Sequence, residues 1–216
     1  MKRVLVVSAH PDDMEIGMGG TVVKMANSGD EIVSVVITDG RRAPDPTSLG
    51  QAMMAELRKD ESEKAAAVLG INKTISFGLE SLASDDACIE ATKKMVEIIN
   101  SFGPEEIYTL HPELDRHSSH RAAGKISVDA LLQYSNENIT LWAYEVWGLF
   151  PRWDRFENIT DEMPTKLAAI GEHKSQIAAI PYIDGISGLN RWRAVFADPH
   201  QSEVKAEYAE VFIRLK

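Results

Sequence analysis

Short apolar runs alternate with amphipathic stretches along the first two thirds of the chain. The run at 4–7 is continuously apolar and the run at 32–38 is rich in β-branched residues, as expected of strands covered on both faces. The expected strands lie at 4–7, 32–38, 74–77, 106–110 and 139–146, and the expected helices at 15–28, 51–69, 86–102 and 120–134. This alternation predicts an α/β fold, with a parallel sheet and helices on both faces.

The pattern becomes less regular after residue 146. A proline in the first turn favours a helix at 164–179, the segment 180–192 is expected to be a loop, and 203–215 is either a helix or a strand. No internal repeat or clear linker divides the chain. We therefore expect a single domain, 1–216, with a core at 1–146 and a C-terminal elaboration at 147–216.

Three polar loops, 8–13, 38–50 and 111–119, leave expected strands at their carboxyl ends. In open parallel sheets, ligands gather at this edge. The fold therefore predicts that residues far apart in the sequence meet in one crevice.

Composition narrows the classes of partner. The formal net charge of -10 disfavours nucleic acid or anionic membrane as partners, because a general basic surface is missing. A single cysteine, Cys88, excludes an intrachain disulfide framework and is typical of a reducing compartment. The N-terminus shows no signal-peptide pattern, and no apolar run approaches the roughly 20 residues that span a bilayer. We expect a soluble, cytoplasmic protein.

The segment "SAHPDDMEIGMGG", at 8–20, places His10, Asp12 and Asp13 at a strand-to-helix junction. An imidazole and a carboxylate three residues apart suit Zn²⁺ and related divalent ions, but a third ligand must come from elsewhere. Helix capping is the alternative. Capping explains one aspartate, and leaves the histidine and the second acid unexplained.

The segment "HPELDRHSSH", at 111–120, holds three of the six histidines and follows another expected strand. His117 and His120 are three apart and could share a helical face. Clustered histidines at the same sheet edge as His10 and Asp13 favour a metal site. Three protein ligands with an open position are typical of a catalytic zinc.

Glycines 17, 19 and 20 raise the alternative of a dinucleotide-binding loop. That fingerprint needs a third glycine where this chain has Val22, and the preceding acids put negative charge where a pyrophosphate would sit. Close packing of a helix on the sheet is the favoured interpretation of these glycines.

Arginines offer a candidate anchor for a hydroxyl-rich or anionic ligand: Arg41 and Arg42 in the 38–50 loop, and Arg58 on the following helix. Spacing alone favours a solvated helix face on which Arg58 pairs with Glu61. For "HKSQ", at 173–176, capping or core hydrogen bonding is the favoured interpretation.

Together these segments resemble the LmbE/PIG-L family of zinc-dependent deacetylases, which act on N-acetylglucosamine-type amides. The family's first motif, A-H-P-D-D-x-E-x-G-x-G-G, is complete at 9–20. Its R-x-x-E element matches Arg58 and Glu61, and its D-x-H-P-D-H motif corresponds to "DRHSSH" at 115–120. An H-x-S-Q motif after a helical lysine matches "HKSQ" and Lys166, and "YAEVF" at 208–212 also resembles the family.

The resemblance implies a Rossmann-like, mostly parallel fold whose C-terminal region shapes a substrate pocket, and a small N-acetylated sugar substrate such as a malate conjugate or a chitobiose derivative. It also implies a homo-oligomer, a trimer or hexamer. The implied site holds zinc, or another divalent ion such as Fe²⁺, on His10, Asp13 and His120. Asp12 is then the general base, His117 lies beside the zinc water and substrate, Asp115 orients His117, and Arg58 contacts substrate. Arg41, from the 38–50 loop, is a second candidate for substrate binding on its chemistry alone.

One departure from the family pattern concerns Ser118 and Ser119, which replace the usual Pro-Asp. Either Asp115 orients His117 in place of the missing acid, or His117 is less basic than in relatives. The residue completing the oxyanion site stays open among three candidates, Tyr182, Arg191 and Arg193. The changed motif also keeps open an inactive family member that binds a sugar-like metabolite.

Overall fold

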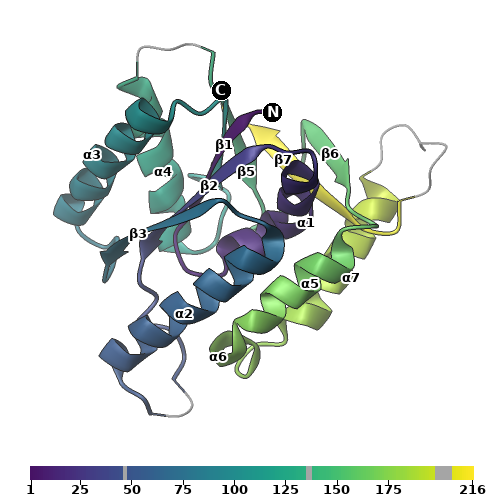
Figure 1. The fold of residues 1–216 in the computed structure, drawn as a ribbon, viewed down its shortest axis with the longest axis horizontal. Coiled ribbons are helices and arrows are strands. Elements are labelled where there is room, and N and C mark those ends of the chain that lie inside the picture. Colours follow the sequence, from purple (N-terminus) through teal and green to yellow (C-terminus); the bar gives the residue numbers. More distant parts are fainter. Residues whose placement is uncertain (46–47, 135–137, 198–205) are drawn as a thin grey trace.

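The computed structural model describes residues 1–45, 48–134, 138–197 and 206–216. Within them, seven strands form one sheet in the order β3-β2-β1-β4-β5-β7-β6 (Figure 1). The strands are β1 (Arg3–Ser8), β2 (Glu31–Thr38), β3 (Lys73–Leu79), β4 (Glu106–Leu110), β5 (Thr140–Tyr144), β6 (Arg155–Asn158) and β7 (Ala209–Arg214). The strands β1 to β5 are parallel, and β7 is antiparallel to β5 and β6. The expected α/β fold with a mostly parallel sheet is confirmed.

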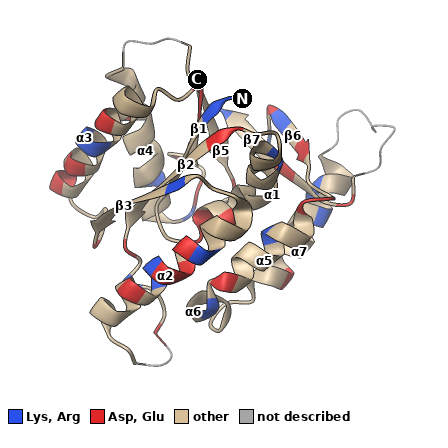
Figure 2. Cartoon of the chain, in the orientation of Figure 1, with Lys and Arg blue, Asp and Glu red and all other residues tan. Residues whose placement is uncertain are grey.

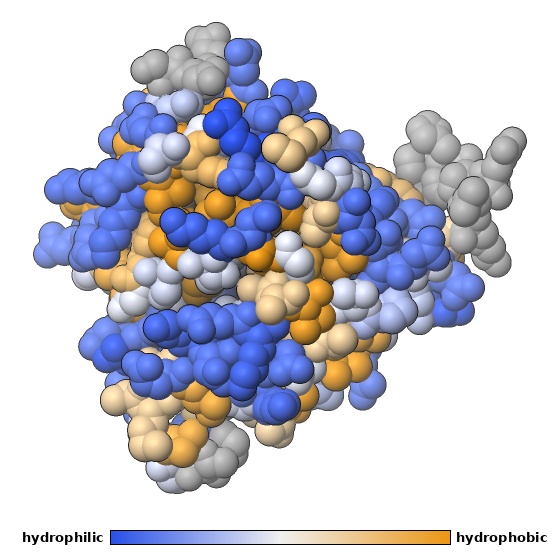
Figure 3. Space-filling model, in the orientation of Figure 1, coloured by the Kyte–Doolittle hydropathy of each residue, from blue (hydrophilic) through white to orange (hydrophobic). Residues whose placement is uncertain are grey.

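Helices cover both faces of this sheet. They are α1 (Asp13–Asn27), α2 (Gln51–Leu69), α3 (Asp85–Phe102), α4 (Ser118–Leu132), α5 (Met163–Glu172), α6 (Lys174–Ile177) and α7 (Tyr182–Phe196). On one face α1, α2 and α5 contact one another, and on the other α3 packs against α4 (Figure 1). Charges of both signs are interspersed on α2 and α3 (Figure 2), and hydrophilic residues gather over α2 (Figure 3). No described helix has the length and apolar character needed to cross a membrane.

The strand β1 is the switch point of the topology. It lies between β2 and β4, so the chain builds outward from β1 in one direction through β2 and β3, and in the other through β4 and β5. The loops that follow β1 and β4 therefore leave the same edge as neighbours. Ligand crevices of doubly wound sheets open at this point.

The glycines of α1 allow the helix to approach β5 closely. A Cβ added to Gly17 would lie 2.3 Å from Tyr144 Cδ2 and 2.5 Å from the backbone oxygen of Glu145, and one added to Gly20 would lie 2.7 Å from Ile159. Both distances at Gly17 are far inside van der Waals contact. The close-packing interpretation of these glycines is confirmed.

A buried carboxylate on β7 accepts hydrogen bonds from backbone N–H groups that a break in α1 leaves without helical partners. Met18 has non-helical dihedral angles, φ -144° and ψ 20°, which interrupt the helical hydrogen bonding. Glu210 accepts hydrogen bonds from the backbone N–H groups of Gly20 and Thr21, and from the Nζ of the fully buried Lys166. The C-terminal strand thus holds the N-terminal helix in place through a paired, hydrogen-bonded charge.

The C-terminal region differs from its predicted elements. The segment 180–192, predicted to be a loop, contains most of α7, and the predicted helix at 164–179 divides at His173, whose ψ is 59°. Part of the untyped segment 203–215 forms β7, while 203–205 lie outside the described residues. The helix α7 buries Ile186, Asn190 and Arg193. Pro181, Gly185 and Gly188 favour a loop in this segment, because glycine and proline are the strongest signals against a helix.

Gly17→Ala tests the close approach of α1. We expect it to lower the free energy of unfolding by about 1–3 kcal/mol, because the new methyl group meets backbone as well as a ring. Gly171→Ala on α5 is the matched control, since its φ is not positive and nothing lies within 4 Å of the added Cβ. It should leave stability unchanged or raise it by up to about 1 kcal/mol. Urea unfolding of both variants decides, and equal effects would contradict the packing argument.

Candidate metal centre and active-site pocket

The loop after β1 carries backbone strain at Asp12. Its φ is 145° and its ψ is -20°, a conformation that residues other than glycine rarely adopt. Asp12 is the N-cap of α1, yet its side chain makes no capping hydrogen bond. The Oδ2 of Asp13 accepts a hydrogen bond of 2.8 Å from the backbone N–H of His10. Asp12 is therefore not a side-chain cap, although Asp13 does lie in the first turn of α1. Backbone strain like that of Asp12 is typical of functional sites.

The loop after β4 is organised by Asp115. The Oδ1 of this carboxylate accepts a hydrogen bond of 2.8 Å from the backbone N–H of His117, the N-cap of α4. Its Oδ2 lies 3.1 Å from Nδ1 of His120, in the first turn of that helix. Asp115 was expected to orient the ring of His117; the structure instead places its carboxylate at the ring of His120.

Atoms of three side chains from these two loops converge on one point. Nε2 of His120 lies 3.1 Å from Nδ1 of His10 and 3.1 Å from Oδ1 of Asp13, and Nδ1 of His10 lies 3.6 Å from Oδ2 of Asp13. Zinc with nitrogen and oxygen ligands at about 2.0–2.2 Å in tetrahedral geometry separates its ligand atoms by roughly 3.3 Å. The observed spacings match that value, so this donor set fits a divalent ion.

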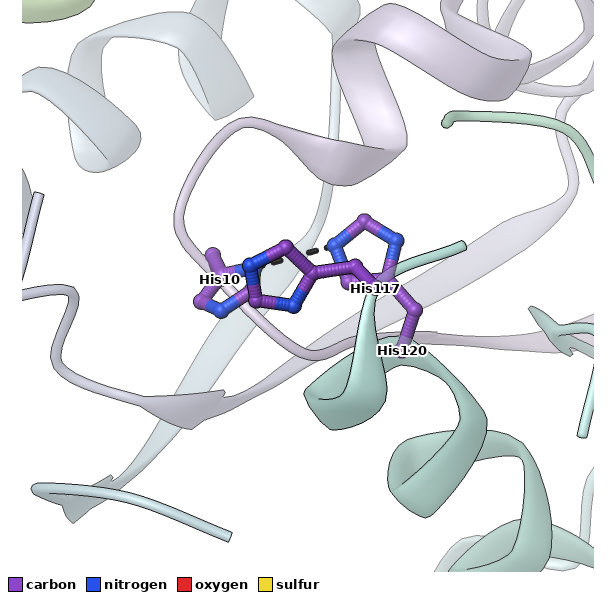
Figure 4. Close-up of side chains that lie close together, drawn as sticks. All are labelled: His10, His117 and His120. Carbon is purple, nitrogen blue, oxygen red and sulfur yellow. Dashed lines mark hydrogen bonds between the residues drawn. The ribbon is translucent and has the colours of Figure 1, made fainter. Parts of the chain in front are cut away.

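His117 is a competing donor. Its ring centroid lies 5.0 Å from that of His10 and 4.9 Å from that of His120, and donor atoms of the three histidines lie within 4.8 Å of one another (Figure 4). However, in His10 and His120 the ring nitrogen that points away from the cluster already faces a partner. Nε2 of His10 lies 2.9 Å from Ser119 Oγ, and Nδ1 of His120 lies 3.1 Å from Asp115 Oδ2, as is common for metal-bound histidines. This arrangement favours His10, Asp13 and His120 as ligands, with His117 at their side.

The charges in the cluster complement a cation. Burial alone would raise the pKa of Asp13, but the imidazoles of His120 and His10 hold it well below its usual range. Burial alone would lower the pKa of His120, but Asp13 and Asp115 on either side raise it to about 10. Without an ion, protonated His120 compensates one of the two negative charges beside it; a bound divalent cation would compensate both.

Asp12 has a different partner. Its Oδ2 lies 3.0 Å from Nη2 of Arg58, and both side chains are buried. The same guanidinium donates hydrogen bonds to the backbone oxygens of Pro11, at 2.6 Å, and Gly40, at 3.3 Å. Burial raises the pKa of Asp12, and the charge of Arg58 opposes that rise. Arg58 does not occupy the solvated helix face suggested by its spacing: it holds the Asp12 loop.

A pocket of about 740 Å³ opens over the cluster. It contains His10, Asp12, Asp13 and His117 together with the side chains that form its outer wall. That wall includes Trp147, Ile180 and Tyr182 from the C-terminal region, and Arg42 and Leu82 from other loops. The rings of Trp147 and Tyr182 meet edge to face, with centroids 6.2 Å apart. Sequence reasoning singled out Tyr182 but missed Trp147, for which no motif gives a signal.

Arg41 lies away from this pocket. Its guanidinium is paired with Asp39, at 2.6 Å, and with Glu80. The neighbouring Arg42 is exposed and lines the pocket, whereas Arg41, the predicted substrate contact, does not line it. Of the oxyanion candidates, Arg193 is buried in an ion pair with Glu145 and Arg191 lies near Glu207 at the surface.

The segment "HKSQ", at 173–176, packs against residues of α1 and α2. Ser175 donates to Glu61 from both its backbone N–H, at 2.8 Å, and its hydroxyl, at 2.7 Å. His173 is buried with its Nε2 3.7 Å from Oε1 of Glu15. Burial lowers the pKa of His173, but Glu15 and Asp12 outweigh that effect and raise it. The expected Arg58–Glu61 pair on one helix is thus replaced by two tertiary pairs.

A mostly parallel α/β sheet with a His/Asp cluster at its switch point defines a Rossmann-like protein with a candidate metal-dependent site. The chain belongs to the PIG-L family, described as GlcNAc-PI de-N-acetylase, whose model matches residues 5–131.

Known proteins are similar to this chain in sequence and in fold. Diacetylchitobiose deacetylase of Thermococcus kodakarensis is 29% identical over 192 residues, which are 82% of this chain and 70% of that protein. The structure of N,N'-diacetylchitobiose deacetylase from Pyrococcus horikoshii matches with a TM-score of 0.84 and 24% identity, covering 99% of this chain and 84% of that one. The 4-carboxy-2-hydroxymuconate hydratase GalB of Pseudomonas putida KT2440 matches with a TM-score of 0.84 and 20% identity, covering 100% and 97%. The fold alone therefore does not decide the reaction.

Metal analysis of three variants tests the donor set. His120→Ala and Asp13→Ala should each lose zinc from the roughly one ion per chain expected of a catalytic site, because each removes a ligand from the converging set. His117→Ala should retain it and serves as the matched control. Equal loss of zinc from His117→Ala would assign the site to three histidines instead.

Proposed function

We propose that this protein is a metal-dependent deacetylase that hydrolyses the N-acetyl amide of an N-acetylglucosamine-type sugar, releasing acetate and a free amine. One observation carries the proposal: a buried carboxylate, Asp12, lines the same pocket as His10 and Asp13, whose ligand atoms converge with Nε2 of the fully buried His120. The deacetylases among the relatives support the choice of bond.

His10, Asp13 and His120 would hold the ion. A divalent ion bound there supplies Lewis acidity and lowers the pKa of a bound water towards ~7. Asp12 accepts a proton from the attacking water, because its raised pKa makes it a better base than an exposed aspartate while Arg58 keeps its carboxylate in place. His117, on the pocket side, stabilises the negative charge that develops on the amide carbonyl oxygen.

The remaining walls suit a sugar. Trp147 is partly exposed in the pocket and offers an apolar ring face to the C–H face of a pyranose. Arg42, which also lines the pocket, can donate to hydroxyl or anionic groups. The volume of about 740 Å³ lies within the range of small-molecule sites and admits more than one sugar ring.

Acetate release from a panel of substrates tests the proposed reaction. N-acetylglucosamine, N,N'-diacetylchitobiose and N-acetylglucosaminyl malate are incubated with the zinc-loaded protein. We expect acetate from at least one of them, and loss of that activity after chelation with recovery on adding zinc. Binding without release across the panel would instead support the inactive sugar-binding alternative.

Asp12→Asn separates proton transfer from metal binding. The variant keeps the size of the side chain but removes the base, so kcat should fall by roughly 10²–10⁴-fold while zinc content stays unchanged. Asparagine also tolerates positive φ better than most residues, which limits the effect on folding. Retention of most of the activity would show that Asp12 is not the base.

A further inference from the structure

Ser119 joins the two histidine-bearing loops through one hydroxyl. Its Oγ lies 2.9 Å from Nε2 of His10 and 2.7 Å from Nδ1 of His117. It stands in the first turn of α4, partly buried, where the family motif has an aspartate. Asp115 does not take over this contact, because its two oxygens are engaged by the backbone of His117 and the ring of His120.

The chemistry of a hydroxyl limits what these two contacts can be. A serine has one hydrogen to donate, and a neutral imidazole has one N–H donor and one acceptor nitrogen. The hydroxyl can therefore donate to only one of the two rings. Among the described residues its hydrogen meets no acceptor other than these two ring nitrogens, so it donates to whichever of them carries no hydrogen and accepts from the other. The direction of the two hydrogen bonds is known once the position of the ring hydrogen is known for one of the two histidines.

His10 fixes that direction. Its Nδ1 is the nitrogen that faces His120 and Asp13, and under the proposed metal-binding role it offers a lone pair to the ion. The hydrogen of the neutral ring must then sit on Nε2, which donates to Ser119 Oγ. The hydroxyl hydrogen of Ser119 is left to donate to Nδ1 of His117.

We propose that Ser119 is a positioning residue that holds His117 in the tautomer carrying its hydrogen on Nε2, so that His117 acts on the pocket as a neutral hydrogen-bond donor. Its role in turnover rests on the proposed deacetylase function. With Nδ1 accepting from Ser119, the Nε2–H is the group that His117 can present to a carbonyl oxygen. The ring stabilises negative charge without first acquiring a proton.

A carboxylate at position 119 would have the opposite effect. An ionised aspartate only accepts hydrogen bonds, so it would require a hydrogen on Nδ1 of His117 and would leave Nε2 as an acceptor or make the ring cationic. Ser119→Asp should therefore reverse the tautomer, and Ser119→Ala should remove the preference. Ser119→Thr keeps the hydroxyl and should preserve it.

Nitrogen-15 NMR of the histidine side chains measures this tautomer directly. In zinc-loaded protein, the shifts and two-bond couplings of His117 should show hydrogen on Nε2 in the parent and in Ser119→Thr, a mixture in Ser119→Ala, and hydrogen on Nδ1 in Ser119→Asp. The assignment of the His117 signals comes from their loss in His117→Ala. Because no substrate is involved, this measurement decides the inference even if no sugar of the panel is turned over.

Kinetics at saturating zinc give the second readout. Ser119→Ala should lower kcat by roughly 10–100-fold with little change in KM, as is typical when a residue that orients a site histidine is removed, and Ser119→Thr should restore most of it. Ser101→Ala is the matched control, since the hydroxyl of Ser101 donates to the backbone oxygen of Ile98 within α3. This variant should leave kcat unchanged. Zinc content is measured for every variant.

An Nε2–H tautomer that persists in both Ser119→Ala and Ser119→Asp would overturn the proposal. Loss of kcat in Ser119→Thr equal to that in Ser119→Ala would also overturn it, because the hydroxyl would then not be the active feature. If the wild-type chain turns over no acetylated sugar but shows the expected tautomers, the proposed function fails while the assignment of Ser119 stands.

Discussion

The buried carboxylate of Asp13 is the contact on which the site depends. It accepts the backbone N–H of His10 from the loop after β1 and meets the ring of His120 from the helix after β4, so it joins the two loops that leave the switch point. A carboxylate buried to this degree is costly unless it is paired. The pairing therefore requires both loops to keep their positions, and the crevice between them is set before any ligand enters.

Behind that contact, the helix α1 must lie close to the sheet. Gly17 lets it approach β5, and Glu210 on β7 satisfies the backbone groups exposed at the kink. The C-terminal strand thus helps to orient the N-terminal motif, although about 190 residues separate Gly20 from Glu210. The same C-terminal region supplies Trp147 and Tyr182 to the pocket, so one part of the chain both braces the site and encloses it.

The sequence predicts the core well because its signals there are local. The run at 4–7 is fully buried in β1, and the first motif follows at once, so strand, turn and chemistry are contiguous. Pairs between residues that are far apart in the sequence give no local signal of this kind. Arg58 gives no sign that it meets Asp12 rather than Glu61, and nothing distinguishes Arg41, which is neutralised by Asp39 and Glu80, from its neighbour in the pocket. Gly185 and Gly188 obscure α7, because glycine disfavours a helix that the tertiary packing of Ile186, Asn190 and Arg193 nevertheless stabilises.

The two neighbouring aspartates show how environment divides identical groups. The imidazoles around Asp13 hold its pKa well below the usual range, so it stays ionised and is suited to a cation. Burial raises the pKa of Asp12, and a single arginine only partly offsets this, so its carboxylate gains a proton more readily. Pairs of acids whose pKa values are pushed apart in this way are typical of sites where one binds and the other moves protons. The strained φ of Asp12 makes this division possible, since it turns two adjacent side chains towards different partners.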